Sequence, residues 1–154
     1  MQSRTHDKGP FAALHHVCIV VEDLDAKVEF YQRLGIGPWS DYPKSSPYVE
    51  LEVANPEGSK ALRYKCADLA NFQLQLCEPS THDTPQRRFL DEHGEGVFHL
   101  GFDVEDLSAA VEQGRNLGLD IFSRGLRADG TGFCYFDTRH GAGTVLEIRK
   151  SARP

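Results

Sequence analysis

The chain has 154 residues, of which 40% are apolar and 26% charged, so it is long enough to form one compact domain with a buried core. Its net charge of −6, from 17 Lys and Arg against 23 Asp and Glu, disfavours nonspecific binding to nucleic acid or to an anionic membrane. We therefore expect a small molecule as its partner.

The first ten residues are polar and lack the apolar run of a signal peptide, and no later stretch has the length of a transmembrane helix. We therefore expect a cytoplasmic protein. The cysteines lie far apart, mostly in apolar surroundings, and form no C-x-x-C motif, so we interpret them as buried thiols. They are Cys18, Cys66, Cys77 and Cys134.

The chain repeats itself at an offset of 83 residues, because 99 − 16 = 83. The segment His16–Leu24 aligns with His99–Leu107, and both begin with histidine and end in Val-Glu-Asp-Leu. The agreement continues through the following helical segment to Gly35 and Gly118. Such a match indicates a duplicated module.

Each copy predicts a strand that starts at the histidine, followed by a helix with Asp23 or Asp106 as its N-cap. Apolar residues recur at helical spacing in both helices. Gly35 and Gly118 then stand where a left-handed residue commonly ends a helix. Between the copies, Thr84 as N-cap predicts a short connecting helix.

Extended segments follow each helix. The strands predicted most clearly are Tyr48–Val53, Ala61–Cys66 and Phe72–Cys77 in the first half, and Gly132–Phe136 and Thr144–Arg149 in the second. Asn55–Gly58 and the glycine-rich residues 137–143 are predicted turns. We therefore expect one α+β domain of two tandem βαβββ modules, with a curved mixed sheet around a cleft. The modules span about residues 12–80 and 95–150, after a tail at 1–11.

A duplicated module places equivalent residues about a pseudo-twofold axis, so His16 and His99 are expected to point into one concavity. The last strand of each half supplies a second pair, Gln75 and Glu147. Apolar residues flank Glu147, and an inward carboxylate there needs a partner such as a metal ion. These four residues are our candidate ligands of one divalent ion.

Each candidate also has a plain structural interpretation. A single histidine at the start of a strand is more often a hydrogen-bonding residue than a ligand, and only the repeat favours the pair. Gln75 alone is more readily interpreted as a solvent-facing strand residue. His15 and His140 are weaker candidates that we expect at the surface. Four cations, Arg87, Arg88, Arg149 and Lys150, could attract a phosphate-bearing group such as coenzyme A, although scattered cations usually form a solvated face.

Two imidazoles, an amide oxygen and a carboxylate form a mixed nitrogen and oxygen ligand set. Such a set suits Co, Ni, Mn, Zn or Fe(II), and Mg is also an option. If the ion is six-coordinate, two adjacent sites stay open for substrate oxygens or water. This arrangement favours Lewis-acid chemistry.

These motifs resemble the vicinal oxygen chelate superfamily of glyoxalases, bleomycin resistance proteins and dioxygenases. The opening Leu-His-His-Val-Cys-Ile-Val-Val-Glu-Asp-Leu and the Phe-Tyr-Gln-Arg-Leu-Gly at 30–35 carry the resemblance. Gln-Leu-Cys-Glu-Pro from Gln75, the run that ends at His99, and Thr-Val-Leu-Glu-Ile around Glu147 are most similar to methylmalonyl-CoA epimerases. In those epimerases the matching His, Gln, His and Glu bind a divalent ion.

The resemblance implies a metal-dependent epimerase or isomerase, homodimeric, that removes a proton beside a carbonyl of a small molecule such as an acyl thioester and forms a metal-stabilised enolate. Glu147 would act on one face of the carbon. Bacterial epimerases of this kind are similar in carrying another Glu on the strand before the Gln ligand, but residues 61–66 hold no carboxylate. Glu50, Glu52 or Lys65 would then be the second acid–base group.

Three other functions use similar residues. A glyoxalase-like lyase of the lactoylglutathione lyase type would use the same ion, but those enzymes more commonly carry Glu where this chain has Gln75. An extradiol-type dioxygenase needs three open sites on iron, which a fourth protein ligand disfavours. A metal-free binding protein of the antibiotic-resistance kind would instead stack its ligand on aromatic residues such as Trp39, Tyr48 and Tyr135.

Overall fold

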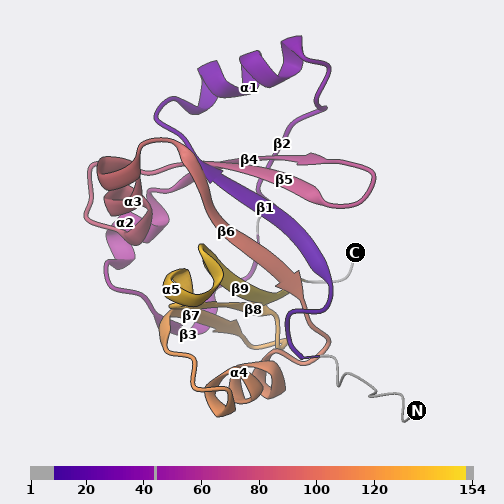
Figure 1. Cartoon of the computed structure of the whole chain (residues 1–154), viewed down its shortest axis with the longest axis vertical. Coiled ribbons are helices and arrows are strands. Elements are labelled where there is room, and N and C mark those ends of the chain that lie inside the picture. Colours follow the sequence, from indigo (N-terminus) through magenta and orange to yellow (C-terminus); the bar gives the residue numbers. More distant parts are fainter. Residues whose placement is uncertain (1–8, 44, 152–154) are drawn as a thin grey trace.

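The computed structural model describes residues 9–43 and 45–151, and within them nine strands form one mixed sheet. The strand order is β2-β4-β5-β1-β6-β9-β8-β7-β3. Figure 1 shows α1 and α4 on the outside of the curved sheet, at opposite ends of the molecule. The predicted α+β class is confirmed.

The elements follow the chain in two similar series. The first comprises β1 (Leu14–Val20), α1 (Leu24–Arg33), β2 (Ser40–Asp41), β3 (Tyr48–Glu52), α2 (Pro56–Lys60), β4 (Arg63–Asp68) and β5 (Gln73–Glu78). The connecting helix is α3 (Pro85–His93). The second comprises β6 (Gly96–Asp103), α4 (Leu107–Asn116), β7 (Ile121–Arg127), β8 (Gly132–Phe136), α5 (Arg139–Ala142) and β9 (Val145–Lys150).

The repeat is visible in the strand order. β1 and β6 form an antiparallel pair at the centre, and each has a parallel partner on its other side, β5 for β1 and β9 for β6. β4 and β8 extend the two halves in the same antiparallel manner. The module boundaries at about residues 12–80 and 95–150 stay a prediction; residues 1–8 of the predicted tail lie outside the described residues.

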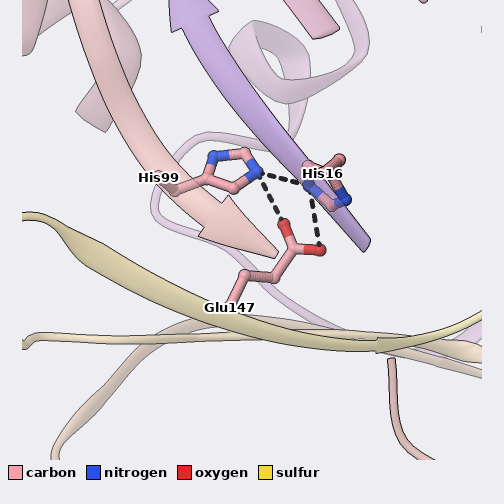
Figure 2. A group of neighbouring side chains, drawn as sticks. All are labelled: His16, His99 and Glu147. Carbon is pink, nitrogen blue, oxygen red and sulfur yellow. Dashed lines mark hydrogen bonds and ion pairs between the residues drawn. The ribbon is translucent and has the colours of Figure 1, made fainter. Parts of the chain in front are cut away.

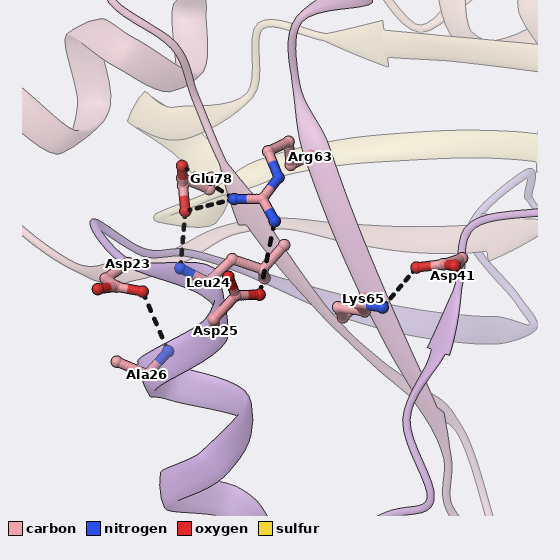
Figure 3. Close-up of polar contacts among 8 residues, drawn as sticks. All are labelled: Asp23, Leu24, Asp25, Ala26, Asp41, Arg63, Lys65 and Glu78. Atoms are coloured by element: carbon pink, nitrogen blue, oxygen red, sulfur yellow. Dashed lines mark hydrogen bonds and ion pairs between the residues drawn. The ribbon is translucent and has the colours of Figure 1, made fainter.

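The helices begin and end as the sequence predicts. The side chains of Asp23 and Asp106 each accept a hydrogen bond of 3.0 Å from the backbone N–H three residues further on, and Figure 3 shows the first of these caps. Gly35 and Gly118 follow the two helices with φ of 81° and 83°. Thr84 caps α3 as expected. Across the part of the chain that the structure describes, no helix has the length and apolar character to cross a membrane.

Apolar side chains fill the space between sheet and helices. Leu24 of α1 packs with Leu76 of β5, and Val111 of α4 shares a cluster with Phe136 of β8. The four cysteines are buried and form no disulfide, which confirms their interpretation as buried thiols. α1 and α4 therefore cover the outer face of their own halves, and the inner face is left for the site.

The strand expected at Tyr48–Val53 is present as β3, and it pairs with β7 of the second half. A local pattern gives the faces of a strand and does not specify its partner. Two segments differ from the prediction. The turn expected at Asn55–Gly58 is instead the start of α2, because Asn55 is an N-cap and Pro56 fits the first helical position. The turn at 137–143 contains the short helix α5.

Asp23→Ala is expected to lower the free energy of unfolding by about 1 kcal/mol, because the first turn of α1 loses its side-chain acceptor. Asp23→Asn keeps an acceptor oxygen and should retain most of that stability. Urea denaturation of the two variants beside the wild type measures the difference. Equal losses in both variants would contradict the capping role of this side chain.

Candidate metal centre

Three buried side chains from three strands meet where the modules join (Figure 2). His16 Nε2 lies 2.8 Å from His99 Nε2, while Glu147 places Oε2 3.0 Å from His99 Nε2 and Oε1 3.7 Å from His16 Nε2. The histidines are each 1% exposed and the glutamate 5%. Their ligand atoms all lie within 4.8 Å of one another, so the group could hold a metal ion.

The sheet register brings these side chains together with a fourth. Glu147 lies on the parallel partner of β6, level with the residue two positions after His99. Gln75 lies on the parallel partner of β1, level with the residue two positions after His16. The glutamine and the glutamate therefore occupy equivalent positions in the two modules, as the two histidines do.

A β-bulge precedes each histidine. The register of the β1–β6 pair skips His15 on one strand and Phe98 on the other, and an extra residue of this kind re-aims its side chain. His15 is consequently half-buried at the inner face, with its Nε2 2.6 Å from Nη1 of Arg149. This corrects the expectation that His15 is a surface residue, whereas His140 is exposed as expected. The two consecutive histidines near the start of β1 are the sequence signal that could have indicated an inward His15.

Burial and neighbouring charges set the protonation of the group. Burial raises the pKa of Glu147, but the imidazoles of His99 and His16 outweigh it and hold that pKa far below its usual range. Burial lowers the pKa of His99 by more than the adjacent carboxylate raises it. A carboxylate and a neutral imidazole are the forms that bind metal ions.

The donor set fits a divalent ion. Ligands about 2.1 Å from a common ion and at right angles to each other lie about 3 Å apart, and the contacts of 2.8 and 3.0 Å match that spacing. Without a cation, imidazole lone pairs and a carboxylate would face one another away from water, which is costly. Nδ1 of His99 is buried and has no hydrogen-bond partner among the described residues, so the polar contacts of this ring are made by Nε2.

Gln75 is 2% exposed and lines the same cavity as His16 and Glu147. Its Nε2 donates to Oε1 of Gln73 at 2.8 Å, and Nε2 of Gln73 donates to Asp68 at 2.9 Å. This chain of hydrogen bonds occupies the amide nitrogen. The amide oxygen is therefore the atom that Gln75 offers to a cation.

The cavity has a volume of about 540 Å³. Aromatic rings line much of it, from Tyr42, Tyr48, Tyr64, Phe122, Phe133 and Tyr135. Its cationic lining side chains are Lys60, Arg127, Arg149 and Lys150, and among the described residues Glu147 is the one acidic side chain in the lining. The wall is thus positive in a chain of net charge −6, which favours an anionic ligand.

The structure does not bring Glu50 and Glu52 to this cavity. Both carboxylates pair with Arg124 of β7, at 3.4 and 2.9 Å. Leu51, between them, lines the cavity. Because successive residues of a strand face opposite sides, the two glutamates face outward.

Lys65 lies at the outer edge of the first half, where it pairs with Asp41 of β2 (Figure 3). In the same region, Glu78 accepts a hydrogen bond of 2.7 Å from the backbone N–H of Leu24 and lies 3.4 Å from Arg63. These contacts join α1 and β4 to β5. Lys65 is not among the described residues that line the cavity.

The model of the Glyoxalase/Bleomycin resistance protein/Dioxygenase superfamily matches residues 15–135 of this chain. The ethylmalonyl-CoA/methylmalonyl-CoA epimerase of Cereibacter sphaeroides is 23% identical over 141 residues, which cover 89% of this chain and 96% of that protein. The crystal structure of methylmalonyl-CoA epimerase from Mycobacterium tuberculosis has the same fold, with a TM-score of 0.69 at 23% identity over 95% of this chain and 92% of that one. A variant of Streptomyces coelicolor methylmalonyl-CoA epimerase in complex with 2-nitronate-propionyl-CoA gives 0.67 at 26% identity, over 92% of this chain and 98% of that one.

Gly101→Ala is expected to abolish tight metal binding, because a Cβ at this position would overlap the imidazole ring of His16. Gly96→Ala on the same strand is the matched control, since its Cβ would meet Phe89 at an ordinary 3.8 Å. Titration with Co²⁺, followed by absorption, compares the two variants with the wild type. Wild-type affinity in a folded Gly101→Ala protein would contradict the placement of this ring.

Proposed function

We propose that this chain, which belongs to the Glyoxalase/Bleomycin resistance protein/Dioxygenase superfamily, is a divalent-metal-dependent epimerase or isomerase that removes a proton beside a carbonyl group. The observation that carries the proposal is the meeting of His16, His99 and Glu147 in a buried group beside an aromatic-lined cavity. The similarity to epimerases of acyl-CoA compounds supports the same class of reaction, with an acyl thioester as the proposed substrate.

Four side chains would hold the ion: the imidazoles of His16 and His99, the amide oxygen of Gln75 and the carboxylate of Glu147. Imidazole with oxygen ligands suits Co, Ni, Mn, Zn, Fe or Mg. A divalent ion bound there supplies Lewis-acid stabilisation of negative charge on a carbonyl oxygen. The aromatic rings that line the cavity lower the local dielectric constant, which strengthens that electrostatic effect.

Glu147 is the proposed proton acceptor, because it is ionised and is the one acid that lines the cavity among the described residues. Epimerisation also needs a proton donor on the other face of the carbon. Glu50, Glu52 and Lys65, expected from the sequence, lie outside the cavity lining. The described lining offers hydroxyl groups in place of a second carboxylate, including that of Tyr135, whose pKa burial raises, so that it stays protonated.

The alternatives fit the site less well. A glyoxalase-like lyase would use an ionisable group where this chain has Gln75, and an amide cannot accept the proton. Of the aromatic residues suggested for a metal-free binding protein, Tyr48 and Tyr135 line the cavity, whereas Trp39 packs against Tyr31 in the cluster under α1. A metal-free role would leave the buried carboxylate of Glu147 without a cation.

The homodimer that the resemblance implies is also part of the proposal. Phe30, Leu34 and Leu117, on or just after the outer helices, are 49%, 61% and 63% exposed. Exposed apolar side chains of this size are common at interfaces between subunits. Light scattering coupled to gel filtration tests this assembly.

Metal content tests the ligand set. After reconstitution with Co²⁺, the wild type is expected to retain one ion per chain on gel filtration, measured by elemental mass spectrometry. His99→Ala and Gln75→Ala should lose it because each removes a ligand, while His140→Ala, an exposed histidine outside the group, should retain it. No bound metal in the reconstituted wild type would overturn the enzymatic proposal and leave a binding cleft.

Proton exchange tests the reaction. The metal-loaded protein is expected to exchange the α-hydrogen of methylmalonyl-CoA or propionyl-CoA with D₂O, followed by NMR. Glu147→Gln should slow this exchange about 100-fold or more, because it removes the proton acceptor. Glu50→Gln is the matched control and should leave the rate within about twofold, since this carboxylate faces Arg124.

Metal content is measured on the same samples, so loss of exchange is separated from loss of the ion. Exchange at the wild-type rate in metal-loaded Glu147→Gln would contradict the role of this carboxylate. Equal losses in the two variants would contradict the assignment of Glu50 to the outer face.

A further inference from the structure

We propose that Arg149 is an anion anchor that binds a carboxylate of the substrate beside the candidate metal ligands. The inference rests on the proposed function for its choice of cavity and substrate, but the anchor itself is tested without metal. It concerns a residue that the reaction described above does not use.

Arg149 stands two residues after Glu147 on β9, and alternate residues of a strand face the same side of the sheet. Both side chains line the cavity, and that of Arg149 is 12% exposed. Glu147 is already engaged by the two histidines of the candidate metal centre. The guanidinium is therefore an enclosed cation next to the site and is not the partner of its carboxylate.

The guanidinium of Arg149 makes its polar contacts with the protein through one nitrogen, Nη1. Nη1 of Arg149 lies 2.6 and 2.7 Å from the ring nitrogens of His15 and 3.6 Å from Oδ1 of Asp103. The guanidinium makes no other polar contact within residues 9–43 and 45–151. Nε and Nη2 form the edge that pairs with a carboxylate through two parallel hydrogen bonds. Among the described residues, no polar partner occupies that edge.

The positive charge of Arg149 is weakly compensated. Asp103 is 45% exposed and lies at the long distance of 3.6 Å, and such an exposed contact contributes little. His15 supplies nitrogen atoms to Nη1 but no negative charge. A largely buried cation in this situation gains from an anion that pairs with it closely.

The other cations of the cavity do not have this combination. Arg127 donates to the hydroxyl of Tyr48 at 2.8 Å and to the carbonyl of Ser46 at 2.9 Å, and it stacks on the ring of Tyr48. Its nitrogens therefore bind β3 and the residues just before it to β7. Lys60 is exposed at the end of α2, and neither Lys60 nor Lys150 offers a planar pair of donors. Arg149 is the cation best placed to orient a ligand at the candidate metal centre.

The ligand class follows from this geometry. A carboxylate on the Nε and Nη2 edge would leave the rest of the same molecule next to Glu147, on the same strand and in the same cavity. The predicted substrate is a carbonyl compound that also carries a carboxylate. A neutral carbonyl compound would leave the guanidinium without an anion.

The experiment uses malonate as the probe and isothermal titration calorimetry as the measurement, on apoprotein and on Co²⁺-loaded protein. Arg149→Gln is expected to weaken malonate binding about tenfold or more in both forms, as loss of a charge-assisted pair requires. Lys60→Gln, which removes one charge from the same cavity, is the matched control and should weaken it less than about threefold. Malonamide, the neutral analogue, should bind no form measurably.

Arg149→Lys keeps the charge but loses the paired donors, so it should bind malonate more weakly than the wild type. It also serves as the second variant if Arg149→Gln does not fold. Equal weakening by the Arg149 and Lys60 variants, wild-type affinity in Arg149→Lys, or no malonate binding by either wild-type form would overturn the anchor. A wild type that binds malonate through Arg149 but takes up no Co²⁺ would support the anchor and count against the proposed function.

Discussion

The buried contact between the imidazoles of His16 and His99 and the carboxylate of Glu147 is the interaction around which the sheet is arranged. The three residues come from β1, β6 and β9, and only the central antiparallel pair with its parallel neighbour brings them to one point. Apolar side chains of similar volume would fill this place at lower cost. We therefore interpret the group as functional. It depends on the register of the strands, on the two β-bulges and on the absence of a side chain at Gly101.

The parts of the fold that the sequence predicted are those that depend on local or repeated patterns. Caps at Asp23 and Asp106 and glycines after the helices act within one turn, so they can be recognised without tertiary information. The 83-residue offset added the long-range information that paired His16 with His99. The confirmed α+β class rests on these two kinds of pattern.

The features that the sequence did not predict depend on which strands pair with each other and in which register. The pattern of Tyr48–Val53 identified a strand correctly, but its pairing with β7 turned Glu50 and Glu52 toward Arg124. The bulge at His15 is likewise a property of the β1–β6 register, and alternation alone would send this side chain outward. Candidate acid–base residues chosen by sequence position were therefore misplaced, whereas the four candidate ligands, which lie on strands fixed by the repeat, share one region.

The distribution of charge connects this arrangement to the chemistry. The chain has a net charge of −6, yet the described cavity wall holds four cations and one carboxylate, so its acidic side chains lie mainly elsewhere. In an aromatic-lined space of low dielectric constant, fixed cations interact more strongly than in water with charge that develops during a reaction. Removal of a proton beside a carbonyl moves negative charge onto the carbonyl oxygen, so cations placed there stabilise the transition state more than the substrate. Arg149 differs from a metal ion in this respect, because a carboxylate that it binds carries the same charge before and after proton removal. Its contribution would therefore be to orientation and specificity, and a divalent ion held by His16, Gln75, His99 and Glu147 would supply the stabilisation of developing charge.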